Sequence, residues 1–269
     1  LTFSILYLAI DFCITKFVEV RAFSAFFLPD GIEGRKNKPS FSGVFGTPIS
    51  EFNGVVNIGI FGERLSKAAG CQFASESILF IGDSTTAGFE VDDDETFVSV
   101  FNNNCKSSGA YGINLGVRAH DTHAVIGTYI RVKDDLPHDA VVYLMTENDF
   151  EENINPNAYH MMTKRFGRRF NGNIQEPDYT LKFRAIASLR LFIADNFSLT
   201  TLFLIRANKT LKGFYKWNTK IAKLDQKISL QVDEAYTLIM DLNKRVNTSN
   251  AKLFVVPFPW LYSTNRDFL

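Results

Sequence analysis

Cysteine is scarce in this sequence, and its few positions exclude several classes of protein. The 269 residues contain three cysteines, Cys13, Cys71 and Cys105, and none of their spacings matches that of metal ligands. So few cysteines cannot form the dense disulfide framework of a small secreted domain. Cys71 and Cys105 could close one disulfide, but we favour an unpaired, buried position for each.

An excess of charge of either sign is also absent. Lys and Arg total 29, as do Asp and Glu, so the net charge is zero. The overall charge therefore gives no reason to expect a nucleic acid or an acidic surface as a partner. The sequence shows no internal repeat, low-complexity tract, metal site or cofactor motif. With 46% hydrophobic residues, the chain is long enough for one large domain with an appendage.

Apolar runs long enough to cross a bilayer are missing as well. Residues 1–10 are almost wholly apolar, but a spanning helix needs roughly 20 such residues, and Asp11 follows. Two interpretations stay open for this segment, the end of a signal anchor that begins upstream and an ordinary buried helix. We favour the anchor, and we divide the chain into an anchor remnant at 1–30, a linker or arm at 31–54 and an α/β domain at 55–269 with an insert at about 151–217.

The order of the predicted elements indicates the fold class. Segments rich in strand formers alternate with amphipathic segments of helical period from about residue 57 onward. The predicted strands cover residues 77–81, 112–117, 140–145 and 252–257, and the predicted helices cover residues 95–103, 122–133 and 218–246. Such alternation forms right-handed βαβ units. We therefore expect an α/β fold, a three-layer α/β/α sandwich around a parallel, flavodoxin-like sheet whose C-terminal part is incomplete.

Three short motifs follow successive predicted strands. They are Gly82-Asp83-Ser84, Asn114-Leu115-Gly116-Val117 and Glu147-Asn148-Asp149. Because the carboxyl ends of parallel strands meet at one edge of a sheet, we expect Ser84, Gly116 and Asn148 to converge. A serine hydroxyl among N–H donors is the arrangement of a nucleophile beside an oxyanion hole. The sequence therefore predicts Ser84 as the nucleophile, with the Ser84 N–H, the Gly116 N–H and the Asn148 amide as oxyanion donors.

These motifs resemble those of the SGNH hydrolases, also called the GDSL family. The family's Gly-Asp-Ser, central Gly and Asn-Asp blocks match residues 82–84, Gly116 and residues 148–149, and we assign supporting roles to Asp83 and Asp149. The resemblance covers roughly residues 55–155 and implies a flavodoxin-like fold with esterase, lipase or carbohydrate acetyl-processing activity. The stretch 82–97 is similar to a subgroup whose members often sit behind one N-terminal anchor. The resemblance thus implies a membrane-anchored protein with a periplasmic or extracellular domain.

The general base that such a serine needs is the gap in the sequence. Family members supply it from an Asp-x-x-His block after the last strand, and no histidine follows Pro257. Residues 135–138 have the same spacing, but they precede the third predicted strand and so belong to the opposite edge of the sheet. His120 and His123 are expected to be solvated or capping side chains, and His160 a surface residue. We therefore expect a fragment that ends before its Asp-x-x-His block and is nearly inactive, while the complete protein is active.

The function that these residues favour is hydrolysis of ester bonds by a serine nucleophile. The expected substrates are O-acyl or O-acetyl esters, on carbohydrate or on a small molecule, and no cofactor is implied. A carbohydrate O-acyltransferase and a non-catalytic binding protein of the same fold remain as alternatives. A nucleotide-binding domain is disfavoured because the first loop lacks a Gly-rich phosphate cradle. An α/β-hydrolase is disfavoured because Ser84 is not in a Gly-x-Ser-x-Gly elbow.

Overall fold

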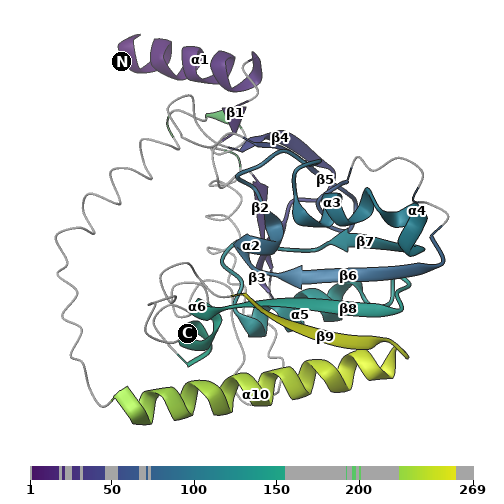
Figure 1. The fold of residues 1–269 in the computed structure, drawn as a ribbon. Helices are drawn as coiled ribbons and strands as arrows, with labels where there is room; N and C mark the ends of the chain where they lie inside the picture. Colours follow the sequence, from purple (N-terminus) through teal and green to yellow (C-terminus); the bar gives the residue numbers. More distant parts are fainter. Residues whose placement is uncertain are drawn as a thin grey trace, which may run out of the picture.

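A parallel sheet of four strands forms the centre of the molecule (Figure 1). The computed structural model describes residues 2–17, 20–21, 26–30, 33–45, 54–66, 71, 74–154, 192, 196–197, 200 and 224–258. The sheet has the order β7-β6-β8-β9. Its strands are β6 (Glu76–Gly82), β7 (Ala110–Asn114), β8 (Ala140–Thr146) and β9 (Lys252–Phe258). In chain order this is 2-1-3-4, which is the beginning of the flavodoxin-like order 2-1-3-4-5.

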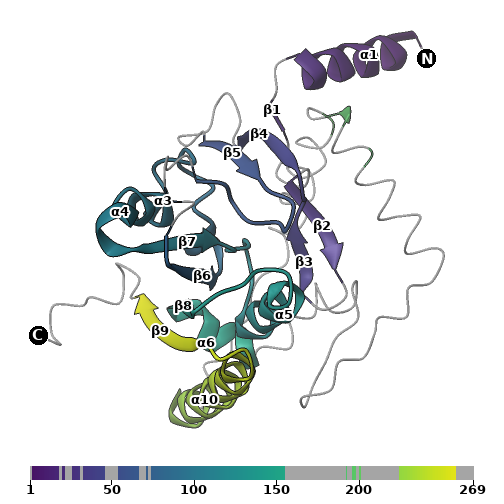
Figure 2. The same ribbon diagram turned by 90° about the vertical axis from the view of Figure 1, so that its right-hand side faces the viewer.

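Helices cover both faces of this sheet, so the expected α/β class is confirmed (Figure 2). On one face, α5 (Thr122–Val132) and α10 (Leu224–Thr248) pack on the sheet. Their apolar side chains share one core with the strands, which includes Leu79, Ile81, Tyr129, Val141, Tyr143, Leu238 and Leu242. On the other face lie α3 (Phe97–Asn102) and α4 (Cys105–Ser108), and the Phe80 ring contacts Phe97 and Phe101.

The observed elements lie close to the predicted ones, and the helix caps explain where the helices begin. The Thr96 side chain accepts from the Ser99 N–H and starts α3, and the Asp121 side chain accepts from the Ala124 N–H and starts α5. The predicted strand 112–117 is observed earlier, as β7 at Ala110–Asn114. Residues 218–223 of the predicted last helix lie outside the described residues, as do His160 and most of the insert at 151–217.

The described part of the predicted linker or arm at 31–54, residues 33–45 and 54, contains strands. They are β3 (Gly34–Asn37), which pairs with β2 (Phe27–Asp30) in a hairpin, and β4 (Phe41–Phe45), which pairs with β5 (Gly54–Ile58). The first strand, β1 (Val20–Arg21), runs parallel to β4. A second core of Phe26, Phe27, Val56, Ile58, Ala87, Phe89 and Val117 joins these strands to the main domain. Within 31–54, residues 34–37, 41–45 and 54 are therefore in strands.

The first helix, α1 (Thr2–Phe17), exposes most of its apolar side chains. Ile5 and Leu6 are 60% and 56% exposed, so the alternative of an ordinary buried helix does not describe this segment. Asp11 is buried, and its carboxylate accepts hydrogen bonds from the N–H and the hydroxyl of Thr200 at 2.8 and 2.6 Å. No helix within the described ranges has the length and apolar character that crossing a membrane requires.

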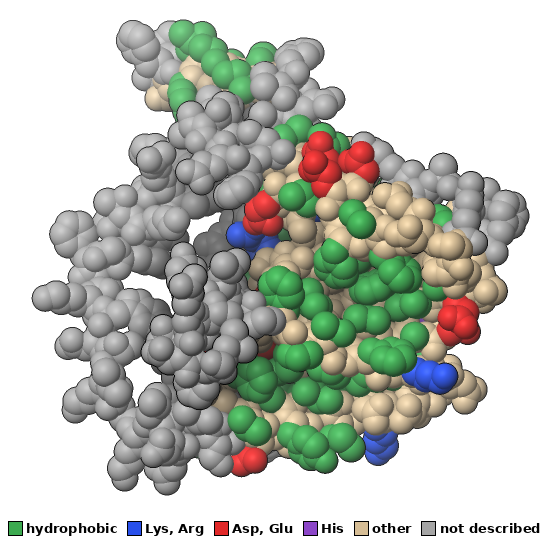
Figure 3. Space-filling view, viewed as in Figure 1, with side chains coloured by type: hydrophobic (Ala, Val, Ile, Leu, Met, Phe, Trp, Pro, Cys, Tyr) green, Lys and Arg blue, Asp and Glu red, His purple; other side chains and the backbone are tan. Residues whose placement is uncertain are grey.

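An apolar surface lies on the sheet beside α3 and α4 (Figure 3). Phe254, Val256 and Phe258 of β9 contribute to the exposed apolar surface, at 52%, 42% and 47%. β9 is the outer strand among those described. Its Lys252 N–H points toward β8 and donates to Asp139. Since successive N–H groups of a strand alternate in direction, the nitrogen of Pro257 faces the outer edge, where proline removes no ladder bond.

Cys71 and Cys105 are joined by a disulfide, which corrects the expectation that each is unpaired. Their Cα atoms are 5.7 Å apart, and both residues are buried. The pair links the segment before β6 to α4, which the linear sequence separates by 34 residues. Cys13 is the free cysteine, and it is exposed.

Reduction of this disulfide is expected to lower the free energy of unfolding by about 3 to 4 kcal/mol, because a loop of this length gains chain entropy once it is opened. Thermal unfolding with and without dithiothreitol measures the effect, and the Cys71→Ser/Cys105→Ser double variant should match the reduced protein. Cys13→Ser should keep the full response to the reductant. A Tm that is the same in both redox states would contradict a bond between these two residues.

Candidate active site

The first motif forms a tight turn at the carboxyl end of β6. Asp83 caps the short helix α2 (Ser84–Ala87), and its Oδ1 accepts from the Thr85 N–H at 2.8 Å. Ser84 is the first residue of α2 and is half-buried. Gly88 ends the helix with φ = +59°, a left-handed conformation that glycine adopts without strain. Ser84 thus stands where the sheet stops and a helix starts, with its N–H at the helix amino end.

The second motif packs directly against this turn. A Cβ atom on Gly116 would lie 2.3 Å from the Ala87 nitrogen and 2.5 Å from the Thr86 carbonyl carbon, so glycine alone allows this approach. The side chain of Asn114 bridges the two segments, because its Nδ2 donates to the Thr86 carbonyl at 2.9 Å and its Oδ1 accepts from the Gly116 N–H at 3.0 Å. The Gly116 N–H, predicted as an oxyanion donor, is therefore engaged by Asn114 in this structure.

The third motif begins α6 (Glu147–Ile154) at the carboxyl end of β8. Thr146 joins it to the first motif, since its hydroxyl donates to Asp83 Oδ2 at 3.0 Å and its N–H donates to Asp149 Oδ2 at 2.9 Å. Asn148 is half-buried, and its Oδ1 is buried with no partner in the described part of the chain. No hydrogen bond from the described residues therefore holds the amide oxygen of Asn148.

All three motifs therefore lie at one edge of the sheet, where α2 and α6 begin (Figure 1). The contacts of Gly116 with Thr86 and Ala87, and of Thr146 with Asp83, bring the three loops together. The loops that carry the Ser84 hydroxyl, the N–H groups at the start of α2 and the Asn148 amide therefore meet at this edge of the sheet. The carboxylates of Asp83 and Asp149 stabilise these loops, because they accept hydrogen bonds from the N–H groups of Thr85 and Thr146.

Asp149 carries the most perturbed carboxyl group of the site. The pKa of Asp149 is raised to about 7, chiefly because the group is buried and in part because the Asp83 carboxylate is near, while the hydrogen bonds from the Thr146 N–H and the Tyr143 hydroxyl limit the rise. Its Oδ1 is buried without a partner among the described residues, which accounts for part of the cost of charging the group. Burial also raises the pKa of Tyr143, whose hydroxyl donates to Asp149 Oδ2 at 2.9 Å.

Asp149→Asn is expected to remove a pH dependence of stability. The folded pKa of about 7 exceeds that of an unfolded aspartate, about 4. The folded state therefore binds more protons between these values, and stability falls as pH rises from about 4 to about 7. The full loss of stability over this range is up to about 4 kcal/mol.

Above pH 7 the Asp149→Asn variant should be more stable than the parent by a few kcal/mol, and at pH 4 the two proteins should be equally stable. Denaturant unfolding from pH 4 to 8 measures the stability of each protein, with Asp135→Asn, at an exposed aspartate, as the control. Parallel stability profiles for Asp149→Asn and the parent would contradict the raised pKa of Asp149.

No histidine among the described residues is hydrogen-bonded to Ser84. His120 is fully buried, and its Nε2 lies 2.8 Å from the Arg35 carbonyl and its Nδ1 lies 3.4 Å from the Thr128 hydroxyl. His123 lies 3.7 Å from Glu234 of α10. The ring nitrogens of His138 contact the Tyr129 hydroxyl and the Leu136 carbonyl, in the loop before β8. The Asp-x-x-His spacing at 135–138 is therefore at the amino end of β8, as the sequence predicted, and His120 is buried rather than solvated.

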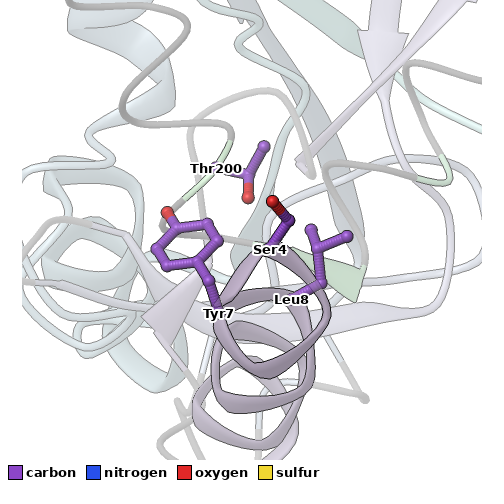
Figure 4. A pocket seen from close by; sticks show the side chains of 4 residues that line it. All are labelled: Ser4, Tyr7, Leu8 and Thr200. Atoms are coloured by element: carbon purple, nitrogen blue, oxygen red, sulfur yellow. The ribbon is translucent and has the colours of Figure 1, made fainter. Parts of the chain in front are cut away.

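Two further features lie apart from this site. A pocket is formed by Ser4, Tyr7 and Leu8 of α1 together with Thr200, and it includes none of the motif residues (Figure 4). Within the ranges that the structure describes, no cluster of three or more His, Cys, Asp or Glu side chains could hold a metal ion.

Sequence reasoning missed the residues that hold the three loops in place. Arg64 and Asp93 form a buried ion pair behind α2, and the Asn37 side chain donates to the carbonyls of Gly62 and Gly116, both at 2.9 Å. The carboxylate of Asp93 belongs to the acidic loop at 92–95, between α2 and α3. The signal that could have suggested a partner for this acidic loop is Arg64, which precedes β6 in the sequence.

Comparison with known proteins adds little to these contacts. No protein-family model matches the chain, and no curated protein matches it. Among solved structures, the SGNH-hydrolase family esterase AlinE4 is 19% identical, with 62% of this chain and 96% of AlinE4 aligned at a TM-score of 0.27. TesA is 12% identical, with 62% of this chain and 99% of TesA aligned at the same TM-score. Scores this low carry no argument about function.

Proposed function

We propose that the protein is a serine hydrolase that cleaves ester bonds. The observation that supports this proposal is that Ser84 starts α2 at the sheet edge where the Gly116 loop packs on α2 and where α6, which contains Asn148, begins. In this proposal, the substrate oxygen that becomes negative receives one hydrogen bond from the Ser84 N–H and a second from the Asn148 side chain. The site contains a nucleophile and a place for a negatively charged oxygen, which are two requirements of acyl transfer.

In the proposed reaction, the Ser84 oxygen attacks the acyl carbon and its proton passes to a base. The carbonyl oxygen becomes negative and receives hydrogen bonds from the Ser84 N–H and the Asn148 Nδ2. The bond to the alcohol then breaks, and the alcohol leaves with a proton. Water attacks the acyl-serine and releases the acid, which restores the Ser84 hydroxyl.

The base is the part of this mechanism that the described residues do not supply. General-base assistance contributes about 10² to 10⁴ to such reactions. A diffusible base of suitable pKa should therefore raise the rate if the Ser84 hydroxyl is accessible and lacks a partner. Imidazole, which titrates near neutral pH, is the natural choice.

The test is hydrolysis of p-nitrophenyl acetate and butyrate by the purified protein, with and without imidazole. We expect turnover above the buffer rate and a further rise with imidazole that depends on Ser84. Equal rates for protein and buffer at every imidazole concentration would reject the hydrolase proposal and favour the alternative of a non-catalytic binding protein. Release of p-nitrophenol that requires a sugar acceptor would instead favour the O-acyltransferase alternative.

We propose O-acyl or O-acetyl groups on carbohydrate as the substrate class, in an extracytoplasmic domain attached to a membrane through the N-terminal segment. The Cys71–Cys105 disulfide supports the location, because such bonds persist mainly in oxidising compartments. The exposed apolar side chains of α1 support a membrane as its partner. Release of acetate from acetylated sugars tests the substrate, and fractionation of cells tests the location.

A further inference from the structure

A buried ion pair lies directly behind the Ser84 turn. The Arg64 Nε is 3.0 Å from Asp93 Oδ1, and the two side chains are 0% and 1% exposed. Neither residue belongs to the three motifs. Because removing two charges from water is costly, a pair this deep in the fold stabilises little by itself. The contacts that surround it indicate its role more directly than the attraction between the charges.

The Arg64 guanidinium binds the end of α2. Its Nη1 donates to the carbonyls of Ala87, at 3.0 Å, and of Gly88, and its Nη2 donates to those of Val55, at 3.2 Å, and Val91. Ala87 is the last residue of α2, and Gly88 is its C-cap. A guanidinium presents its donors in fixed directions, so Arg64 fixes where this short helix ends.

The backbone of Arg64 and the side chain of Asp93 attach this arrangement to the sheets. The Arg64 N–H donates to the Asn114 carbonyl at the end of β7, at 2.8 Å. Asp93 Oδ1 also accepts from the Asn57 N–H of β5 at 3.1 Å, and Oδ2 accepts from the Asn57 side chain. A helix of one turn has almost no stability of its own, so such outside contacts decide its position.

We propose that Arg64, held by Asp93, is a positioning residue for the Ser84 nucleophile. It fixes α2 from the carboxyl end of the helix, so that Ser84 at the amino end keeps its place relative to Gly116 and Asn148. This inference rests on the proposed hydrolase function. A displacement of about 1 Å can cost 10²-fold in rate, even when the displaced group is attached to residues that never touch substrate.

The test compares Arg64→Lys with Arg131→Lys. Arg131 is a matched control because it also pairs with a buried carboxylate, Glu33, and donates to a backbone carbonyl, that of Phe61, but it does not contact α2. Lysine keeps the charge and loses the directed donors. We expect Arg64→Lys to lower kcat by about 10- to 100-fold with KM within about twofold, and Arg131→Lys to leave both constants near the parent values at a temperature where all three are folded.

Backbone amide hydrogen exchange in residues 84–88 supplies a second readout that does not depend on turnover. Exchange there should accelerate in Arg64→Lys and in the isosteric Asp93→Asn, and not in Arg131→Lys. Equal losses of kcat in the two lysine variants, or unchanged exchange at 84–88 in Arg64→Lys, would overturn the positioning role. If the parent protein cleaves no ester, the hydrolase proposal fails, and the exchange measurement alone decides whether Arg64 holds the turn. Should Arg64→Lys not fold, Asp93→Asn provides both measurements.

Discussion

Ser84→Ala is expected to reduce ester hydrolysis to the rate that the oxyanion donors alone can support. In serine hydrolases with a complete set of catalytic groups, loss of the nucleophile costs on the order of 10⁶ in kcat. The loss here should be much smaller without an added base, because the described residues supply no base and the effects of a nucleophile and its base are not additive. Initial rates with p-nitrophenyl acetate, normalised to folded protein, measure it.

The imidazole response makes the Ser84 measurement specific. Imidazole hydrolyses activated esters without protein, so its effect is counted only above that background. We expect the parent protein to respond and Ser84→Ala to give the background slope. Ser75→Ala is the matched control, since Ser75 is an exposed serine whose hydroxyl donates to the Gly109 carbonyl near the amino end of β7. Activity retained in Ser84→Ala would remove Ser84 from the role of nucleophile.

Asn148→Ala is expected to lower kcat by about 10²- to 10³-fold with little change in KM. Such a loss, about 2.7 to 4 kcal/mol, is typical when one oxyanion donor is removed, because the donor acts on charge that develops only in the transition state. Stability should change little, since the Asn148 Oδ1 has no partner among the described residues. Steady-state kinetics and a Tm measurement on the same preparations separate these effects.

Asn148→Asp provides the matching control for the donor role. Aspartate has nearly the shape of asparagine, but its ionised side chain only accepts hydrogen bonds, and its charge repels a negative oxygen. We therefore expect kcat to decrease from the parent to Ala and further to Asp. A change confined to KM in Asn148→Ala would assign the side chain to substrate binding. Equal activity in all three proteins would show that the amide does not act on the reacting oxygen.

Features that depend on residues close together in the chain were predicted correctly, and features that depend on distant residues were not. The apolar runs at 77–81 and 140–145 predicted two central strands correctly, since a strand buried on both faces needs such residues. The helices expected at 95–103 and 122–133 were found as α3 and α5, since a helix start depends on a cap that acts within three residues. Within 33–45 the structure has strands where a linker was expected, because the β2–β3 and β4–β5 pairings depend on partners that composition does not reveal.

By itself, the sequence determined the α/β alternation and the placing of Ser84, Gly116 and Asn148 after successive strands. Both follow from local periodicity and from the geometry of parallel sheets. Only the tertiary structure decided that Cys71 bonds to Cys105, and that Arg64 reaches Asp93 and the end of α2. These contacts join residues that are 34 and 29 positions apart. Their partners are selected by packing in three dimensions, and no local pattern in the chain encodes that choice.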